Sequence, residues 1–139
     1  MMRARPWALW LGVVFLGGTP LVAAGVTTPL ADAVEQQDWD TIDSLLDGSV
    51  DVNEAQVDGM TALHWASYYD EVDLVGRLVT AGADVQVVNR YGVTPLSLAA
   101  ENGNQTIVER LLDTGADANT ALPGGETVLM TAARSGRVG

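Results

Sequence analysis

His64 is the only histidine in this chain of 139 residues, and the sequence contains no cysteine and no lysine. These counts exclude a cysteine nucleophile, a lysine Schiff base and a metal site built from histidines and cysteines. A general base also needs a positioned partner and a substrate cleft, and no serine forms a recognisable triad pattern with His64. The side chains therefore predict no enzyme, no metal and no cofactor, and they favour a structural role for His64.

Carboxylates are the other chemically active groups, because the chain has 18 aspartates and glutamates. Asp51, Asp84 and Asp117 recur at one constant interval, and this regular spacing favours a structural role. The segment from Asp51 to Ala55 begins like a calcium loop but departs from that pattern at Ala55. Catalysis by some other pair of carboxylates is the alternative that the sequence leaves open.

The same interval, about 33 residues, organises the whole chain from Thr28 onward. Four kinds of residue recur in step: Gly59, Gly92 and Gly125; Thr61, Thr94 and Thr127; Leu63, Leu96 and Leu129; Ala66, Ala99 and Ala132. A repeat of this length indicates a solenoid, in which each small unit buries its apolar face against its neighbours. We therefore expect a surface, and not an enclosed pocket, to carry the function.

Each repeat unit contains the signals for two helices. The first helix follows a threonine that can cap free backbone amides, as at Thr61 and Thr94, and Pro95 suits the first helical position. The second helix has apolar residues at helical spacing. Gly82 and Gly115 are expected to end the second helices in a left-handed conformation.

These motifs resemble those of ankyrin repeats, whose unit has the same length and consists of a turn followed by two antiparallel helices. The segments that carry the resemblance are Gly92-Val93-Thr94-Pro95-Leu96, Gly115-Ala116-Asp117 and Thr61-Ala62-Leu63-His64. The family uses a histidine such as His64 for hydrogen bonds within and between repeats. Asp70 departs from the family pattern, because it replaces the glycine between the two helices.

The resemblance implies an all-α solenoid of helix-turn-helix units with short β-turn fingers. We expect about three full repeats and an incomplete fourth, at residues 26–58, 59–91, 92–124 and 125–139. Trp39 and Trp65 align with apolar positions of other units and are expected in the core.

Ankyrin repeats generally meet other proteins through their turn tips and the exposed ends of their first helices. The positions this implies here are Val57, Asp58, Met60, Tyr68, Tyr69, Arg90, Tyr91, Val93, Glu101 and Asn102, with Pro123, Gly124, Glu126, Arg134 and Ser135 as counterparts in the fourth unit. All three tyrosines of the chain fall in this set, and tyrosine is enriched in interface hot spots. The alternative is that Tyr68 and Tyr69 only cover Trp65 and the adjacent helix surface.

The first residues differ in composition from the repeats. Arg3 and Arg5 precede an apolar run, Trp7–Leu16, and small residues follow. This layout is typical of a secretory signal peptide, so we expect residues 1–24 to be removed and 25–139 to form the mature domain. An uncleaved membrane anchor is the alternative, but the run has about half of the roughly 20 residues needed to span a bilayer. The prediction is export to a bacterial periplasm without membrane attachment, with secretion from a eukaryotic cell as the alternative.

The charge of the chain limits its partners. The formal net charge is -11, and removal of Arg3 and Arg5 would make it -13. Nine acidic residues lie between Asp32 and Asp58 without a basic residue among them. Nucleic acid is therefore not an expected partner, because binding to phosphates requires lysine and arginine. The acidic residues either steer a basic partner or only keep the protein soluble.

The fourth unit stops where its second helix should begin, which leaves the apolar side of its first helix, including Leu129 and Ala132, without a cover. We therefore expect a longer natural chain with further repeats, in which residues 25–139 are a non-catalytic binding module. The alternatives are an accessory arm of a longer enzyme and self-assembly through the uncovered end.

Overall fold

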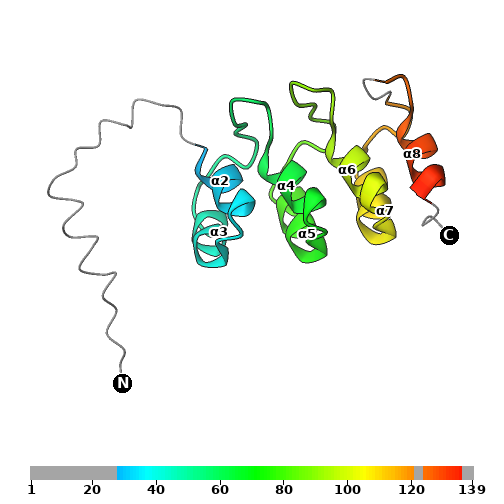
Figure 1. The fold of residues 1–139 in the computed structure, drawn as a ribbon. Coiled ribbons are helices and arrows are strands. Elements are labelled where there is room, and N and C mark those ends of the chain that lie inside the picture. The colour runs from blue at the N-terminus through cyan, green and yellow to red at the C-terminus, as the bar shows by residue number, and fades with distance from the viewer. Residues whose placement is uncertain (1–27, 121–123, 136–139) are drawn as a thin grey trace, which may run out of the picture.

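The computed structural model describes residues 28–120 and 124–135. The elements of this part are all helices, arranged in stacked pairs (Figure 1). The first helices of the pairs are α2 (Pro29–Glu35), α4 (Ala62–Tyr68), α6 (Pro95–Asn102) and α8 (Val128–Ser135); the second helices are α3 (Trp39–Leu46), α5 (Val72–Thr80) and α7 (Gln105–Asp113). The predicted all-α solenoid is confirmed.

Loops that project to the same side connect each pair to the next one (Figure 1). We call residues 47–61 the first finger and residues 81–94 the second finger. Each finger has a tight turn near its tip, closed by a hydrogen bond from Gly59 N to Gln56 O at 2.8 Å and from Gly92 N to Asn89 O at 3.1 Å. The two glycines have φ angles of 88° and 80°, which a side chain with a Cβ atom would make costly.

Local capping bonds explain where the helices begin. Thr94 Oγ1 accepts a hydrogen bond from Ser97 N at 3.1 Å, as predicted for α6, and Pro95 follows at the first helical position. Thr28 precedes α2 at the position equivalent to Thr94, but its hydroxyl donates to the Asp32 carboxylate at 2.9 Å and caps no backbone amide of α2. Asn104 caps the second helix α7 by accepting from Ile107 N at 3.1 Å.

Left-handed residues follow the second helices of the second and third units and the first helices of all three complete units. Gly82 and Gly115 have φ angles of 99° and 109°, which agrees with the left-handed turns predicted after the second helices. Between the first and second helices, Gln37, Asp70 and Gly103 have φ angles of 56°, 60° and 73°. Aspartate tolerates this conformation better than most residues do, which explains how Asp70 replaces the glycine of the family pattern.

The core runs through the stack as one apolar layer between the helices. Its largest fully buried apolar side chains are Leu30, Val34, Ile42, Leu63, Val75, Leu78, Leu96, Ile107 and Leu111. They come from all three complete pairs, and each first helix packs against the next one along the stack. Each unit therefore depends on its neighbours for burial, as expected of a solenoid.

Trp39 was expected in the core, and this is wrong, because 43% of its surface is exposed. It opens α3, the second helix of the first described pair, and no preceding unit among the described residues packs against it. Trp65 is partly buried against the core, and its indole Nε1–H donates to Gln56 Oε1 at 2.8 Å. The signal peptide expected at residues 1–24 and the side chains of Leu129 and Ala132 lie outside the described part.

Candidate partner-binding surface

The finger tips hold four of the residues that the sequence singled out. Val57 and Asp58 are the central residues of the first turn, and Arg90 and Tyr91 are those of the second. Val57 and Tyr91 project away from their fingers, with exposed fractions of 81% and 61%. Arg90 is also exposed, whereas Asp58 is half-buried and accepts a hydrogen bond from Met60 N at 3.0 Å.

Met60 was predicted on the surface, and this is wrong. It follows the turn, and its carbonyl accepts a hydrogen bond from Gln56 N at 2.8 Å. Only 8% of its surface is exposed, because its side chain lies between the fingers with Sδ 3.3 Å from Asn89 Nδ2. Val93 occupies the equivalent position in the second finger and is half-buried there.

At the ends of the first helices, some side chains are exposed to solvent and others are half-buried in hydrogen bonds to a neighbouring helix. Tyr68 is 51% exposed, and Glu101 at the equivalent position of α6 is also exposed. Tyr69 is half-buried, with its hydroxyl donating to Glu35 O at 3.0 Å. Asn102 is also half-buried and donates to Tyr68 O at 2.9 Å, which ties α6 to α4. Asn102 therefore supports the stack, which differs from its predicted place on a binding surface.

Together, the exposed members of the predicted set form what we call the tip surface: Val57, Tyr68, Arg90, Tyr91 and Glu101, with the half-buried Asp58. The fourth unit adds little to it. Arg134 is paired with Glu126 at 2.7 Å, Gly124 is exposed, and Pro123 and the side chain of Ser135 lie outside the described part.

Three aromatic rings gather at the end of α4. Trp65 stacks on Tyr69, with ring centroids 6.0 Å apart and an angle of 22° between the planes. Tyr68 meets both rings edge-on, at centroid distances of 5.8 Å from Trp65 and 5.1 Å from Tyr69. Both interpretations of these tyrosines thus have support, since Tyr69 covers Trp65 while half of the Tyr68 surface remains exposed to solvent.

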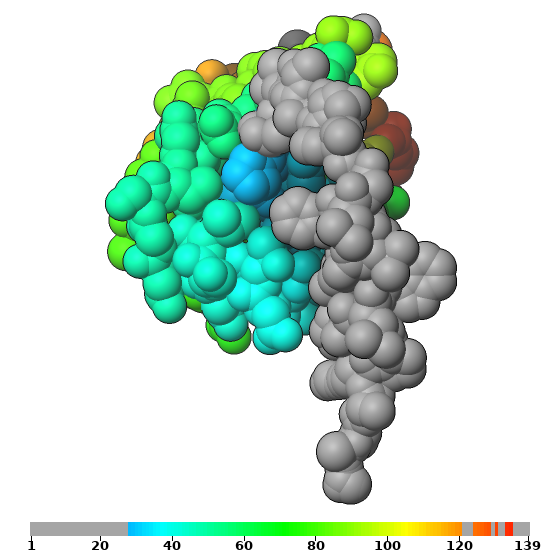
Figure 2. All heavy atoms as spheres, turned by 90° about the vertical axis from the view of Figure 1, so that its left-hand side faces the viewer, coloured from blue at the N-terminus to red at the C-terminus, as the bar shows by residue number. Residues whose placement is uncertain are grey.

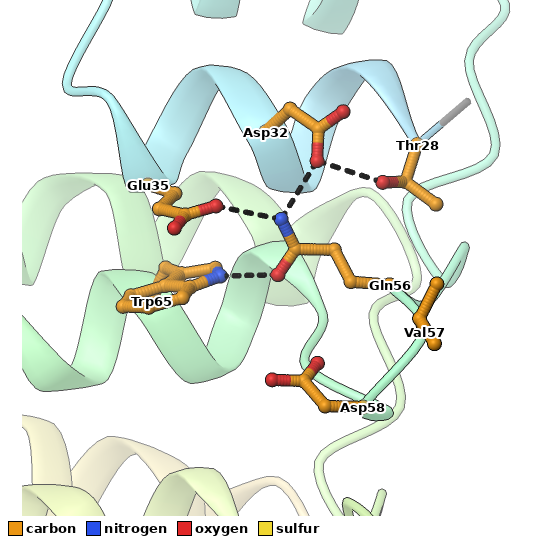
Figure 3. Close-up of a pocket in the computed structure, with 7 residues that line it drawn as sticks. All are labelled: Thr28, Asp32, Glu35, Gln56, Val57, Asp58 and Trp65. Atoms are coloured by element: carbon orange, nitrogen blue, oxygen red, sulfur yellow. Dashed lines mark hydrogen bonds between the residues drawn. The ribbon is translucent and has the colours of Figure 1, made fainter. Parts of the chain in front are cut away.

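Beside this aromatic group lies a cavity of about 480 Å³, which we call the acidic pocket. Its lining comes from α2, the first finger and α4: Thr28, Asp32, Glu35, Gln56, Val57, Asp58 and Trp65. Figure 3 shows the Gln56 side chain at its centre, between the carboxylates above it and the Trp65 indole. Its Nε2 donates to Asp32 Oδ1 at 2.7 Å and to Glu35 Oε2 at 2.8 Å.

Sequence reasoning missed most of this pocket, although a signal for it was present. Asp32 and Glu35 precede Trp65 and Tyr68 by one repeat unit, so they occupy the same two positions of the first helix. The first unit matches the repeat pattern loosely, and the predicted binding positions lie in the later units and in the first finger. The residue type of Gln56 does not identify it as a pocket residue, because its role depends on its hydrogen bonds to three side chains that lie elsewhere in the sequence.

His64 joins two units instead of facing a substrate. Its side chain is fully buried, and Nε2 lies 2.9 Å from the Val93 carbonyl oxygen, which can only accept. Nε2 therefore carries the proton, and Nδ1 accepts a hydrogen bond from Thr61 N at 3.1 Å. Burial lowers the pKa of His64 below its ordinary value of 6.5, while the bond to Val93 and the charge of Asp58 act in the opposite direction.

The described part of the chain offers no cluster of three or more potential metal ligands. Nor does any helix in that part reach the length and apolar character that a membrane span requires.

Comparison with known proteins agrees with the geometry. The family model for ankyrin repeats matches residues 16–89 and 71–139, which together make up most of the chain. The chain matches no curated protein. Stacked helix pairs, projecting fingers with glycine turns and a buried histidine that binds the next unit all accord with this match. The chain belongs to the ankyrin-repeat family, whose members are generally protein–protein interaction modules.

Proposed function

We propose that this chain is a non-catalytic binding module of an exported protein and that it holds a partner protein through the tip surface. The observation that carries the proposal is the exposure of Tyr68 and Tyr91, at 51% and 61%, at the two kinds of position that ankyrin repeats use. Large exposed aromatic side chains supply contact area at a low cost in conformational entropy. Arg90 stands beside Tyr91 and adds a second side chain of the type enriched in hot spots.

The first and second fingers are also held together firmly enough to present one surface. Arg90 N donates to Asp58 O at 2.8 Å, and the Arg90 guanidinium donates to Val57 O at 2.9 Å. Nearer to the second helices, Asn53 of the first finger bonds to the second finger: its Nδ2 donates to Gly82 O at 3.1 Å, and its Oδ1 accepts from Asp84 N at 2.7 Å. Such bonds fix the tips before a partner arrives, which reduces the entropy lost on binding.

The export part of the proposal rests on the composition of residues 1–24, with Arg3 and Arg5 before an apolar run. It places the partner in the periplasm of a bacterium, or outside a eukaryotic cell.

The test is the double variant Tyr68→Ala, Tyr91→Ala in the full chain. Partner capture from the periplasmic fraction of the native host should weaken at least about tenfold, which corresponds to a loss of about 1.4 kcal/mol. The matched control is Trp39→Ala, Leu112→Ala, which removes two side chains 43% and 39% exposed on the second helices α3 and α7. Capture unchanged by the tyrosine variant, or reduced equally by the control, would contradict the proposal.

A further inference from the structure

The acidic pocket lies next to the tip surface, and its charges indicate what part of a partner it accepts. It shares Val57 and Asp58 with the tip surface, and its Trp65 contacts Tyr68. A partner held by the tip surface would therefore also lie over the pocket.

Three carboxylates line the pocket, and the groups that hold them bring no positive charge. The Gln56 amide draws Asp32 and Glu35 together from one side, and the Thr28 hydroxyl also donates to Asp32. Both donors are neutral, so the negative charges remain uncompensated. A cation placed among several nearby carboxylates is stabilised by all of them, especially where the surroundings exclude part of the solvent.

The arginines of the described residues do not neutralise this pocket. Arg77 pairs with Asp43 at 2.7 Å and Arg134 pairs with Glu126, both outside the pocket lining. Arg110 contacts the Val72 carbonyl on the second helices. Arg90 stands on the second finger, where its guanidinium donates to the Val57 carbonyl at 2.9 Å, and no ion pair joins it to a pocket carboxylate.

Trp65 adds an aromatic wall to the three carboxylates of the pocket. Its Nε1–H is used by Gln56, and its ring stacks on Tyr69, so the indole is held in one orientation. Tryptophan is the aromatic residue that binds cations best. Of the two basic side chains, the planar guanidinium of arginine both stacks on an aromatic ring and binds carboxylates through two parallel hydrogen bonds.

We infer that the acidic pocket receives an arginine side chain of the partner protein, among Asp32, Glu35 and Asp58 and beside Trp65. This inference rests on the proposed function, since it names the chemistry of the partner that the tip surface holds. It also gives the acidic first unit, shown at the front of Figure 2, a role in attracting a basic partner before contact.

The first experiment titrates the full chain with two short capped peptides that differ at one residue, arginine or its neutral analogue citrulline. The signal is the indole N–H resonance of Trp65 in a nitrogen-15 NMR spectrum, assigned with the Trp65→Phe variant. We expect the arginine peptide to shift this resonance and to bind at least about fivefold more tightly than the citrulline peptide. Equal affinity for the two peptides would overturn the inference.

The second experiment removes charge without removing hydrogen-bond acceptors. Glu35→Gln, Asp58→Asn keeps an oxygen for Gln56 Nε2 and one for Met60 N. The control is Asp40→Asn, Glu54→Gln, which changes the net charge equally at exposed positions outside the pocket lining. The pocket variant should bind the arginine peptide at least about fivefold more weakly, and the control should stay within about twofold. Equal losses would mean that only overall charge matters and would overturn the inference.

Partner capture separates this inference from the proposed function. Capture that is lost with Tyr68→Ala, Tyr91→Ala but kept with Glu35→Gln, Asp58→Asn would overturn the arginine pocket and leave the proposed function standing. Capture lost with both variants and kept with both controls would support the two together. Capture that persists in the tyrosine variant would contradict the proposed function, whatever the peptide titrations give.

Discussion

The His64→Ala variant is expected to lose about 3 kcal/mol in free energy of unfolding, measured by denaturant titration. The buried imidazole is bonded on both sides, to Thr61 N within its own unit and to the Val93 carbonyl of the second finger. Its removal leaves two buried polar groups without these partners and opens a cavity between the units. Folded domains are stable by only about 5–15 kcal/mol, so this loss is a large fraction of the total.

The matched control is Ser97→Ala, at the equivalent position of the next unit. Ser97 is also buried, but its side chain bonds only to Thr94, through N at 3.0 Å and O at 2.8 Å. Its removal should cost about 1 kcal/mol, the usual value for a local capping bond. If both variants lost the same amount, the bond between His64 and Val93 would contribute nothing to stacking.

The stabilisation from His64 should also depend on pH. Its pKa in the folded state is lowered below 6.5, so the unfolded chain takes up a proton more readily than the folded chain does. This contribution is fully present above pH 6.5 and is lost as the pH falls below 6.5 and through the folded-state pKa. The difference in stability between the wild type and His64→Ala should therefore shrink between about pH 7.5 and about pH 5.5, and a constant difference would contradict this assignment.

The Gly59→Ala variant is expected to cost about 2–5 kcal/mol, from two sources. The backbone of Gly59 has a φ angle of 88°, which a residue with a Cβ atom adopts only with strain. A Cβ atom there would also lie 2.9 Å from Asn89 Cα and 3.0 Å from Arg90 N. Because both of these are backbone atoms of the second finger, the two fingers would have to move apart.

Gly82→Ala is the control for this second source of strain. Its φ angle of 99° is similarly left-handed, but a Cβ atom there would have nothing within 4 Å. It should therefore cost only about 1–2 kcal/mol, from the backbone conformation alone. Equal losses in the two variants would show that the fingers are not closely packed at Gly59.

The repeat pattern was sufficient to predict the helices and their turns, because these depend on residues close together in the sequence. Ser97 bonds to Thr94 at the start of α6, Pro95 suits the first helical position, and Gly82 and Gly115 end second helices through their own backbone freedom. Asp70 is different. Its carboxylate accepts hydrogen bonds from Asn102 and Asn104 of the next unit at 3.3 and 3.1 Å, which no local rule could predict.

The binding surface was predictable only in outline. Val57 and Tyr91 stand in turn tips and are exposed, and their place there followed from the repeat register. Met60 is only two residues beyond Asp58, but its burial depends on the packing of one finger against the next. The acidic pocket depends on contacts between Gln56 and residues 21 and 24 positions earlier, and a search of single motifs does not reveal such contacts.

The most direct test of the proposed binding surface is photocross-linking in the native host. A photoreactive benzoylphenylalanine replaces Tyr68 in one strain and Leu112 in another, since both side chains are large, apolar and exposed but lie on a first and a second helix. We predict that a specific cross-linked adduct forms from position 68 and not from position 112. An adduct that forms only from position 112, or equally from both, would contradict the account.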